Sequence, residues 1–274
     1  MKRTVVVGLG IIGASICGAL SKAGLEVHGT DINEKNVAVA IEKGFILAKA
    51  DALSSYDVVF IAVPLRATKR ILQTETFKDG ALVMDICGVK SEIETAVYSC
   101  KPNFRYVGLH PMAGKETSGI ASASPDLFRM ANLIITRSEQ TDENAVAEAK
   151  ELAKAMRFGK IVECSAKEHD EKIAITSQLA HIVSNAYVKS RQVKNCNGFT
   201  GGSFQDMTRI AGVDENTWTE LYMGNRDCVL DELNGLIEHL TVYRDALASY
   251  DEQKLSDTLK EGRLIRENIK IGRE

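Results

Sequence analysis

A histidine followed by a proline, within a glycine-rich stretch, is the first feature of this chain that could do chemistry. Residues 108–119 read Gly-Leu-His-Pro-Met-Ala-Gly-Lys-Glu-Thr-Ser-Gly and follow the apolar residues Tyr106 and Val107. We expect His110 just beyond the end of a short strand, where Pro111 excludes helix and fixes the backbone. An imidazole there could take a proton from a hydroxyl group near neutral pH. The alternative is a structural histidine in a turn.

A guanidinium in the later part of the chain is the second candidate. Arg209 lies in the segment 205–211, Gln-Asp-Met-Thr-Arg-Ile-Ala, after the flexible pair Gly201 and Gly202. The planar fork of an arginine can hold a carboxylate through two hydrogen bonds. Alternatively, Arg209 pairs with Asp206, three residues earlier. A base and a fixed cation together would suit the oxidation of a hydroxy acid.

A glycine fingerprint near the N-terminus indicates a dinucleotide site. The G-x-G-x-x-G residues are Gly8, Leu9, Gly10, Ile11, Ile12 and Gly13. They follow a strand pattern at 5–7 and open a helix pattern, which is the context that the motif requires. The first glycine would allow a tight turn, the second a close approach of pyrophosphate, and the third helix–strand packing. The helix N-terminus would bind the phosphates. The alternative is a glycine-rich turn without a ligand.

Asp31 lies 18 residues after Gly13, at the end of the next predicted strand. This is the position at which an acidic residue binds the ribose 2′-hydroxyl of NAD. A 2′-phosphate would face its negative charge, and Ile32 and Asn33 follow in place of Arg or Lys. The sequence therefore predicts NAD rather than NADP. The alternative is that Asp31 caps the next helix, ahead of Glu34.

Strand and helix patterns alternate in the first part of the chain. Short, continuous apolar runs predict buried strands at 4–7, 27–30, 58–63, 82–86, 106–109, 133–136 and 161–162. Helix-length segments, such as 14–23 and 143–156, lie between several of them. This alternation predicts an α/β fold with a doubly wound parallel sheet of the Rossmann type.

The character of the chain changes near residue 165. Strand patterns disappear, and no proline follows Pro125. We therefore expect a dinucleotide-binding domain over 1–164 and an all-helical substrate and dimerisation domain over 165–274. Apolar residues in alternating steps of four and three predict a helix that packs on another helix, within the domain or across a dimer. They are Val229, Leu233, Leu236, Leu240, Tyr243, Leu247 and Tyr250.

One predicted helix, over 173–188, carries no formal charge if its histidine is neutral. Its polar residues are Ser177, Gln178, His181, Ser184 and Asn185. A solvated helix face normally carries Lys and Glu, so we expect this face to meet a polar ligand or a partner. The alternative is a buried helix whose polar groups bond to neighbouring backbone.

The totals of the chain exclude several classes of protein. Its 274 residues are 45% hydrophobic and 26% charged, with a net charge of −3, so no basic surface for nucleic acid is expected. No run approaches 18 apolar residues, which argues against a membrane span. Without a signal-peptide pattern or a C-x-x-C pair, the six scattered cysteines predict reduced thiols and a cytoplasmic location. No metal site is expected, because no histidine pair has the spacing for one.

These motifs, in this order, resemble the prephenate/arogenate dehydrogenase family of tyrosine biosynthesis. The resemblance covers nearly the whole chain. It is carried by the fingerprint with Asp31 and by segments 85–90, 108–119, 176–181 and 201–211, with Trp218 downstream. The His-Pro-Met-Ala-Gly and Thr-Arg-Ile-Ala segments are specific to the family, whereas the fingerprint is not.

The resemblance implies an NAD-dependent oxidative decarboxylation of prephenate to 4-hydroxyphenylpyruvate, with CO2 and NADH as the other products. His110 would hydrogen-bond the ring hydroxyl and help remove its proton, and Arg209 would hold a substrate carboxylate. Further substrate contacts would come from Lys90, Glu116, Ser177 and His181. The resemblance also implies a homodimer formed through the helical domain.

The chain departs from the family pattern in two places. Many members carry a serine that touches the substrate where this chain has Gly88; water, Lys90 or a backbone N–H could replace it, or the alignment shifts to Ser91. Many members also have proline at Ala180, where alanine continues a helix well. The length leaves no room for the regulatory or mutase domain of some members, so any inhibition by tyrosine would act at the active site.

Three other functions remain open from the sequence. The first is an arogenate dehydrogenase that forms tyrosine directly. The second is a 3-hydroxyacid dehydrogenase or imine reductase of the same architecture, which would depend on a Lys or Asp on the inter-domain helix. Residues 173–188 contain His181 but neither a Lys nor an Asp. The third is an NAD-sensing protein that binds the dinucleotide without turnover.

Overall fold

The structure is a computed structural model that describes residues 2–114, 117 and 119–269. It divides into two compact units, Met1–Arg226 and Asp227–Glu274. The first unit contains the sheet and the shorter helices after it. The second unit contains two long helices and is described separately.

The described residues of the first unit form one sheet of eight strands. These are β1 (Thr4–Val7), β2 (Val27–Thr30), β3 (Ala48–Lys49), β4 (Val58–Ile61), β5 (Leu82–Asp85), β6 (Arg105–Pro111), β7 (Leu133–Thr136) and β8 (Ile161–Cys164). Their order is β3-β2-β1-β4-β5-β6-β7-β8. The doubly wound fold is confirmed, with one difference. The first six strands are parallel, whereas β7 runs antiparallel to β6 and β8 follows the direction of β7.

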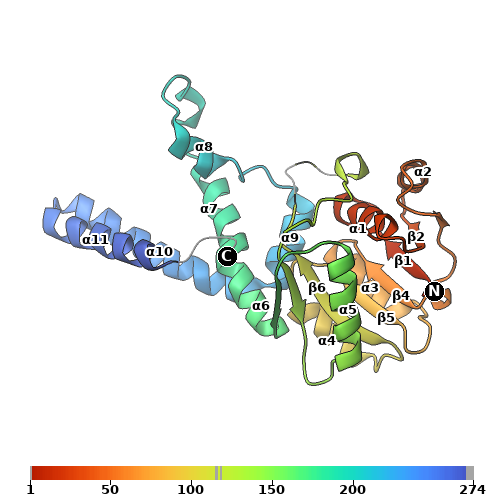
Figure 1. The fold of residues 1–274 in the computed structure, drawn as a ribbon. Coiled ribbons are helices and arrows are strands. Elements are labelled where there is room, and N and C mark those ends of the chain that lie inside the picture. The colour runs from red at the N-terminus through yellow and green to blue at the C-terminus, as the bar shows by residue number, and fades with distance from the viewer. Residues whose placement is uncertain (1, 115–116, 118, 270–274) are drawn as a thin grey trace. The chain divides into compact units, whose positions relative to one another are not determined.

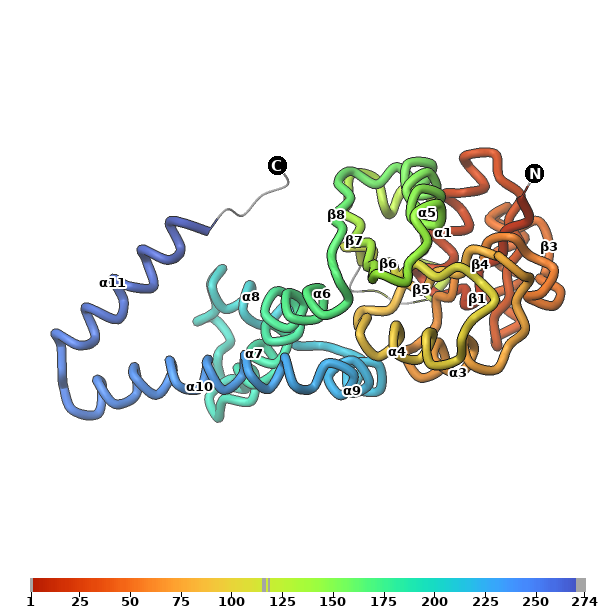
Figure 2. Tube along the Cα trace, turned by 90° about the horizontal axis from the view of Figure 1, so that it is seen from below, coloured from red at the N-terminus to blue at the C-terminus, as the bar shows by residue number. Residues whose placement is uncertain are grey.

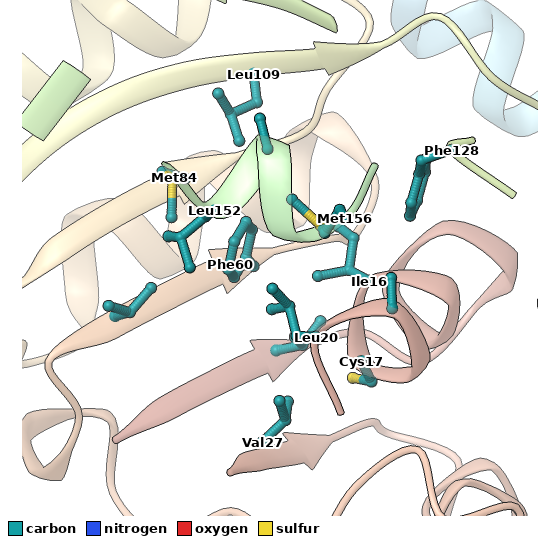
Figure 3. Close-up of a cluster of buried hydrophobic side chains, with 14 of the residues drawn as sticks. Ile16, Cys17, Leu20, Val27, Phe60, Met84, Leu109, Phe128, Leu152 and Met156 are labelled. Carbon is teal, nitrogen blue, oxygen red and sulfur yellow. The ribbon is translucent and has the colours of Figure 1, made fainter. Parts of the chain in front are cut away.

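Helices cover both faces of the sheet. Figure 2 shows α1 (Ile11–Lys22) and α5 (Glu143–Ala155) on one side, and α3 (Leu65–Thr74) and α4 (Ser91–Ser99) on the other. Alternate residues of a strand point to opposite faces, so β4 contributes Phe60 to the first side and Val59 to the second. In Figure 3, Phe60 lies among side chains of α1 and α5. Helix α2 (Glu34–Glu42) belongs to the first side as well.

Strand β6 is longer than the sequence predicts, and it contains His110. It pairs with β5 only as far as Gly108, whereas its pairing with β7 runs from Gly108 to Pro111, with His110 opposite Ile134. The expectation that His110 lies beyond the strand was therefore wrong. The antiparallel β7 extends the ladder on one side of β6, and the side toward β5 is left open for the last three residues.

Helices and turns make up the described chain after β8, as predicted. The first unit continues with α6 (Ala166–Ile173), a π-helical turn (Ala174–Gln178), α7 (Leu179–Tyr187), α8 (Gly202–Thr208) and α9 (Glu215–Gly224) (Figure 1). Short 3₁₀ turns occur at Leu53–Ser55, Ile120–Ser122 and Val193–Asn195. The charge-free segment 173–188 is thus part of a longer continuous helix, α6–π–α7, with the π turn at its centre. A π turn inside a helix is rare and is frequently found at functional sites.

The second unit consists of α10 (Arg226–Ala248) and α11 (Glu252–Asn268). Helix α10 contains the predicted apolar seam up to Leu247. Leu240 and Leu247 are 56% and 61% exposed in the single chain, and Tyr250, beyond the helix, is 92% exposed. Among the described helices, none is both long and apolar enough to cross a membrane.

Candidate active site

The glycine fingerprint forms the turn between β1 and α1. Gly8 has φ +93°, and a Cβ there would lie 2.4 Å from the carbonyl oxygen of Ala62. A Cβ on Gly13 would lie 1.9 Å from the carbonyl oxygen of Gly8, so only glycine allows this helix to pack so closely. Gly10 differs, because a Cβ on it would meet no atom within 4 Å. Its open side is where a ligand could approach the backbone and the first N–H groups of α1.

A pocket of about 460 Å³ adjoins this turn, and Asp31 lines it together with Gly8, Gly10, Asn36 and Arg70. The Asp31 carboxylate accepts hydrogen bonds from the N–H groups of Leu9, at 2.7 Å, and Asn33, at 2.8 Å. These bonds hold the carboxylate beside the fingerprint. Asp31 does not cap α2, because Asn33 is the capping residue and accepts from the N–H of Lys35.

Arg70 is a pocket residue that the sequence argument missed. No cation follows directly after Asp31 in the sequence, whereas Arg70 comes from α3, which begins after β4. The strand order places β4 beside β1, and this brings Ala67, Arg70 and Ile71 of α3 to the pocket. An exposed guanidinium at this place could contact a phosphate or the adenine of a dinucleotide.

A second pocket, of about 260 Å³, shares Gly10, Ala62, Val63 and Pro64 with the first. It is lined by Gly10–Gly13, by the segments after β4 and β5, including Gly88, and by Thr217, Glu220 and Leu221 of α9. The helical part of the first unit and the sheet edge thus share one pocket. A dinucleotide that lies along the fingerprint would extend toward this pocket.

His110 lies next to Gly88, which lines the second pocket. A Cβ on Gly88 would lie 3.8 Å from both Cε1 and Nε2 of His110, and 3.4 Å from Cδ2 of Leu221. The Nε2 edge of the imidazole therefore faces the Gly88 side. These distances are ordinary van der Waals contacts, so position 88 also has room for a small side chain.

Behind His110 lies a buried chain of hydrogen bonds. Nδ1 of His110 is 2.8 Å from Nε2 of His169, and Nδ1 of His169 is 2.8 Å from Oδ1 of Asp170. The Asp170 carboxylate also accepts from the backbone N–H groups of Lys90 and Ser91, at 2.9 and 2.8 Å. The imidazole is thus anchored through α6 to the segment that follows β5.

The sequence analysis did not select His169 or Asp170, although a signal was present. In α6 the buried residues are Ala166, His169, Asp170 and Ile173. This spacing describes one helix face. A histidine and an aspartate in the apolar stripe of a helix indicate a buried polar contact, because unpartnered polar groups are costly inside a protein.

Burial and charge change the acidity of this chain of groups. Burial lowers the pKa of His110 well below its ordinary value, and a positive charge on His169, when it is protonated, or on Lys90 lowers it further. Burial also lowers the pKa of His169, against the opposing effect of its bond to Asp170. For Asp170, burial raises the pKa, but the hydrogen bonds from His169, Ser91 and Lys90 together leave it below its ordinary value. His110 and His169 are therefore neutral and Asp170 is ionised at neutral pH.

Lys90 lies behind the pocket wall. Its side chain has no exposed surface, and Nζ is 2.7 Å from Oδ1 of Asp85, which is equally buried. The Tyr106 hydroxyl donates to the other oxygen of Asp85, at 2.6 Å. Gly108 leaves room for this cluster, because a Cβ there would lie 3.0 Å from the Tyr106 hydroxyl and 3.3 Å from Cδ of Lys90. The family resemblance implied a substrate contact for Lys90, whereas in the structure its ammonium lies in a buried ion pair with Asp85.

The polar face of the charge-free helix bonds mainly to backbone. His181 Nδ1 donates to the carbonyl of Ile210 at 2.8 Å, and the Ser184 hydroxyl donates to that of Met207 at 2.7 Å. Asn185 and Gln178 donate to the carbonyls of Ala211 and Leu221. For these four residues the alternative from the sequence analysis therefore describes the structure. Three of these side chains, His181, Ser184 and Asn185, hold the segment 207–211 against α7.

Arg209 lies in this held segment, directly after α8, and is exposed. The neighbouring carbonyl, of Ile210, is the one that His181 binds. The His181 ring also lies against Trp218 of α9, with centroids 3.9 Å apart. Helix α9 thus connects the two groups of residues, since its Leu221 lies beside Gly88. Ser177 is half-buried in the π turn, and Glu116 lies outside the described residues.

This arrangement is suited to the oxidation of a carbon that bears a hydroxyl group, in which a base takes the hydroxyl proton and a dinucleotide takes the hydride from the carbon. A neutral imidazole presents Nε2 beside Gly88, which lines a pocket together with the fingerprint, where a dinucleotide can bind. An imidazole at this place can act as the general base toward a hydroxyl group. Within the described residues, no three His, Cys, Asp or Glu side chains gather to hold a metal ion.

Comparison with protein families and known proteins supports this interpretation. Residues 16–162 match the family model described as prephenate dehydrogenase, nucleotide-binding domain. Residues 165–261 match the model described as prephenate dehydrogenase, dimerization domain. Together the two models cover most of the chain, from within α1 to within α11, and β1 and the glycine fingerprint precede the matched residues.

Individual relatives agree with the family models. The chain is 30% identical to the prephenate dehydrogenase of Lactococcus lactis subsp. cremoris over 99% of this chain and 78% of that protein. It is 31% identical to the prephenate dehydrogenase of Bacillus subtilis over 94% of this chain and 73% of that protein. A crystal structure of prephenate dehydrogenase from A. aeolicus, in complex with hydroxyphenyl propionate and NAD+, has a TM-score of 0.87 and 26% identity. It covers 98% of this chain, and the match spans 99% of that chain.

Proposed function

The chain belongs to the prephenate dehydrogenase family, and from this premise we propose that it oxidatively decarboxylates prephenate to 4-hydroxyphenylpyruvate in tyrosine biosynthesis. It is an NAD-dependent oxidoreductase, as its nucleotide-binding domain and its relatives indicate. The observation that carries the proposal is the position of His110. Its Nε2 edge lies beside Gly88, at the pocket that the dinucleotide fingerprint also lines.

The residues of the fingerprint fit NAD. The open side of Gly10 and the N–H groups at the start of α1 would bind the pyrophosphate, and Asp31 would accept hydrogen bonds from a ribose. When bound, the nicotinamide accepts the hydride from the substrate carbon. The negative charge of Asp31 would repel a 2′-phosphate, which favours NAD over NADP.

His110 would act as the general base. The ring hydroxyl of prephenate would lie against Nε2, which takes the hydroxyl proton while the carbon that bears it gives up a hydride. The ring carboxylate then leaves as CO2, and its bonding electrons complete the aromatic ring. Because burial keeps His110 neutral, the base is ready to accept a proton at neutral pH.

Arg209 would hold a substrate carboxylate, with its backbone fixed by α7. His181 would have two tasks, since Nδ1 holds the carbonyl of Ile210 and the remaining edge of the ring is left for the substrate pocket. Ser177 and Glu116 stay proposed contacts of the substrate on the strength of the family pattern. Lys90 is not carried forward as a contact, because its ammonium is buried against Asp85.

We further propose a homodimer formed through the helical part of the chain. The match to a dimerization-domain model and the exposed apolar residues of α10 support it. The domain boundary near residues 164 and 165 also stays a proposal, and the limits of the two family models support it. The cytoplasmic location remains a proposal that rests on the expected reduced thiols.

A spectrophotometric assay tests the function. Purified protein is mixed with NAD+ and either prephenate or arogenate, NADH is followed by absorbance, and products are separated by chromatography. We expect NADH and 4-hydroxyphenylpyruvate in equal amounts from prephenate. Tyrosine formed faster from arogenate would reassign the substrate. If the protein binds NAD and forms no NADH from either compound, the proposed function is rejected.

A further inference from the structure

We propose that His169 and Asp170 fix the tautomer of His110, so that Nδ1 carries the proton and the unprotonated Nε2 faces the pocket. Both would be positioning residues for the proton transfer, because neither lies at the pocket wall. The catalytic use of this tautomer rests on the proposed function. The tautomer itself is a property of the free protein and can be measured without a substrate.

The assignment of protons begins at Asp170, where the hydrogen-bonding roles are fixed. Its carboxylate accepts from the backbone N–H groups of Lys90 and Ser91, which can only donate. An ionised carboxylate has no proton to give. The bond between Asp170 Oδ1 and His169 Nδ1, at 2.8 Å, therefore requires a proton on the histidine nitrogen.

The next bond follows from the first. His169 is buried and neutral, so it carries one ring proton, and that proton is on Nδ1. Its Nε2 then has a lone pair and can only accept. The 2.8 Å contact between Nε2 of His169 and Nδ1 of His110 consequently needs the proton on His110. A neutral His110 that holds its proton on Nδ1 has its lone pair on Nε2.

This arrangement is the only one in which both rings are neutral and both hydrogen bonds are made. In the opposite tautomer, the Nδ1 lone pair of His110 would face the Nε2 lone pair of His169. If His169 instead carried its proton on Nε2, the lone pair of its Nδ1 would face the carboxylate of Asp170. The backbone N–H groups at the start of α4 prevent the Asp170 carboxylate from moving away. Asp170 therefore determines which ring nitrogen of His169, and in turn of His110, carries the proton.

The same hydrogen-bonded groups would also stabilise His110 after it takes up a proton. Nδ1–H of the imidazolium would still donate to His169, and the charge would be stabilised through His169 by Asp170. The charged groups that face the pair are Asp170 from α6, Lys90 from the segment before α4 and Asp85 at the end of β5. Lys90 opposes the imidazolium, which favours return of the proton after the reaction.

Two substitutions separate a positioning role from a merely structural one. His169→Gln can place its amide oxygen near the position of Nε2 and accept from Nδ1 of His110. His169→Leu has similar bulk and no acceptor. We expect His169→Leu to lower kcat by about 10–100-fold, the usual effect of removing a group that orients a functional histidine, with little change in KM for NAD. His169→Gln should recover most of the loss.

Nitrogen NMR on the free protein decides the tautomer. With ¹⁵N-labelled histidine, long-range proton–nitrogen correlations at pH 7.5 distinguish protonated from unprotonated ring nitrogens, and His110→Asn assigns the signals. We expect protonated Nδ1 and unprotonated Nε2 in the wild type and in His169→Gln, and a shift toward protonated Nε2 in His169→Leu. Protonated Nε2 in the wild type, or an unchanged tautomer in His169→Leu, would overturn the inference.

The NMR result is independent of the proposed function. If the tautomer is as expected and the wild type does not oxidise prephenate, only the function fails. If the wild type oxidises prephenate and Nε2 is protonated, the function stands, whereas the role of His169 and Asp170 and the use of Nε2 as the general base both fail. NAD titration and the unfolding midpoint show whether each variant is folded. The wild-type spectrum reports the tautomer of His110 even when a variant is not folded.

Discussion

Nδ1 of His110 lies 2.8 Å from Nε2 of His169, so one edge of the His110 ring is bound within the protein. The other edge lies beside Gly88, at the pocket shared by the dinucleotide fingerprint and α9. Division of the ring into a bound edge and a reactive edge is what allows a histidine to serve as an oriented base. The predictions below test the groups on each side of this arrangement.

Lys90 should contribute to stability rather than to substrate binding. Lys90→Met leaves the Asp85 carboxylate buried without its cation, which should lower the free energy of unfolding by about 3–5 kcal/mol. The double variant Lys90→Met/Asp85→Asn should recover part of this loss, because no unpaired charge remains. Urea unfolding measures both. A variant with unchanged stability and a raised KM for prephenate would place the ammonium on the substrate instead.

The stability of the protein should fall as the pH drops below about 6.5. Burial lowers the pKa of His110 in the folded state, whereas an unfolded histidine titrates near pH 6.5. The unfolded state therefore binds more protons below that pH, and the free energy of unfolding rises with pH. At pH 5.5 one such histidine costs about 1.4 kcal/mol of stability relative to pH 7.5.

The comparison of wild type with His110→Asn isolates this contribution. Urea unfolding at both pH values should show a smaller decrease in the variant, by about 1.4 kcal/mol. His239→Asn, in α10, is the control and should behave as the wild type. Equal pH dependence in wild type and His110→Asn would show that His110 is not held neutral by the fold.

Asp31 should determine affinity for NAD and selection against NADP. Asp31→Asn removes a charged acceptor for ribose hydroxyls, and such bonds contribute about 1.5–3 kcal/mol, so the Kd for NAD+ should rise about 10–100-fold. Because the repulsion of a 2′-phosphate is also lost, the ratio of the Kd for NADP+ to the Kd for NAD+ should decrease. Fluorescence titration with both dinucleotides measures this. An unchanged ratio of the two Kd values would remove Asp31 from the selection.

Arg209→Ala should raise KM for prephenate more than it lowers kcat, because it removes a contact that the bound substrate already makes. Asp206→Asn distinguishes the alternative of an internal ion pair. If Arg209 binds the substrate, Asp206→Asn should leave KM close to that of the wild type. A normal KM in Arg209→Ala, with lower stability in both variants, would favour the internal pair.

Much of the sheet could be predicted from the sequence, because buried strands are continuous apolar runs. The bounds of β1, β2 and β7 agree with the predicted ranges. The two-residue β3 was missed, since Ala48 and Lys49 are both exposed and carry no apolar signal. The reversed direction of β7 and β8 was missed as well, because a run of apolar residues does not specify strand direction.

The candidate site was only partly predictable, because some of its residues lie far apart in the sequence. The fingerprint, Asp31 and His110 each lie in a local motif that identifies them. His169 is 59 residues from His110, and Arg70 is far from Asp31 in sequence, so only the folded chain brings these pairs together. The polar face of α7 was expected to meet a ligand or a partner, whereas three of its side chains bond to backbone carbonyls of segment 207–211. Composition alone does not distinguish these two kinds of partner.

The proton acceptor is the central claim, and the kinetics of His110→Asn test it most directly. NADH formation from prephenate is measured for wild type and variant at saturating NAD+, with NAD affinity determined separately. We predict that kcat falls about 10²–10⁴-fold, the usual contribution of a general base, while the Kd for NAD+ changes little. A His110→Asn enzyme that keeps nearly full turnover would contradict the account.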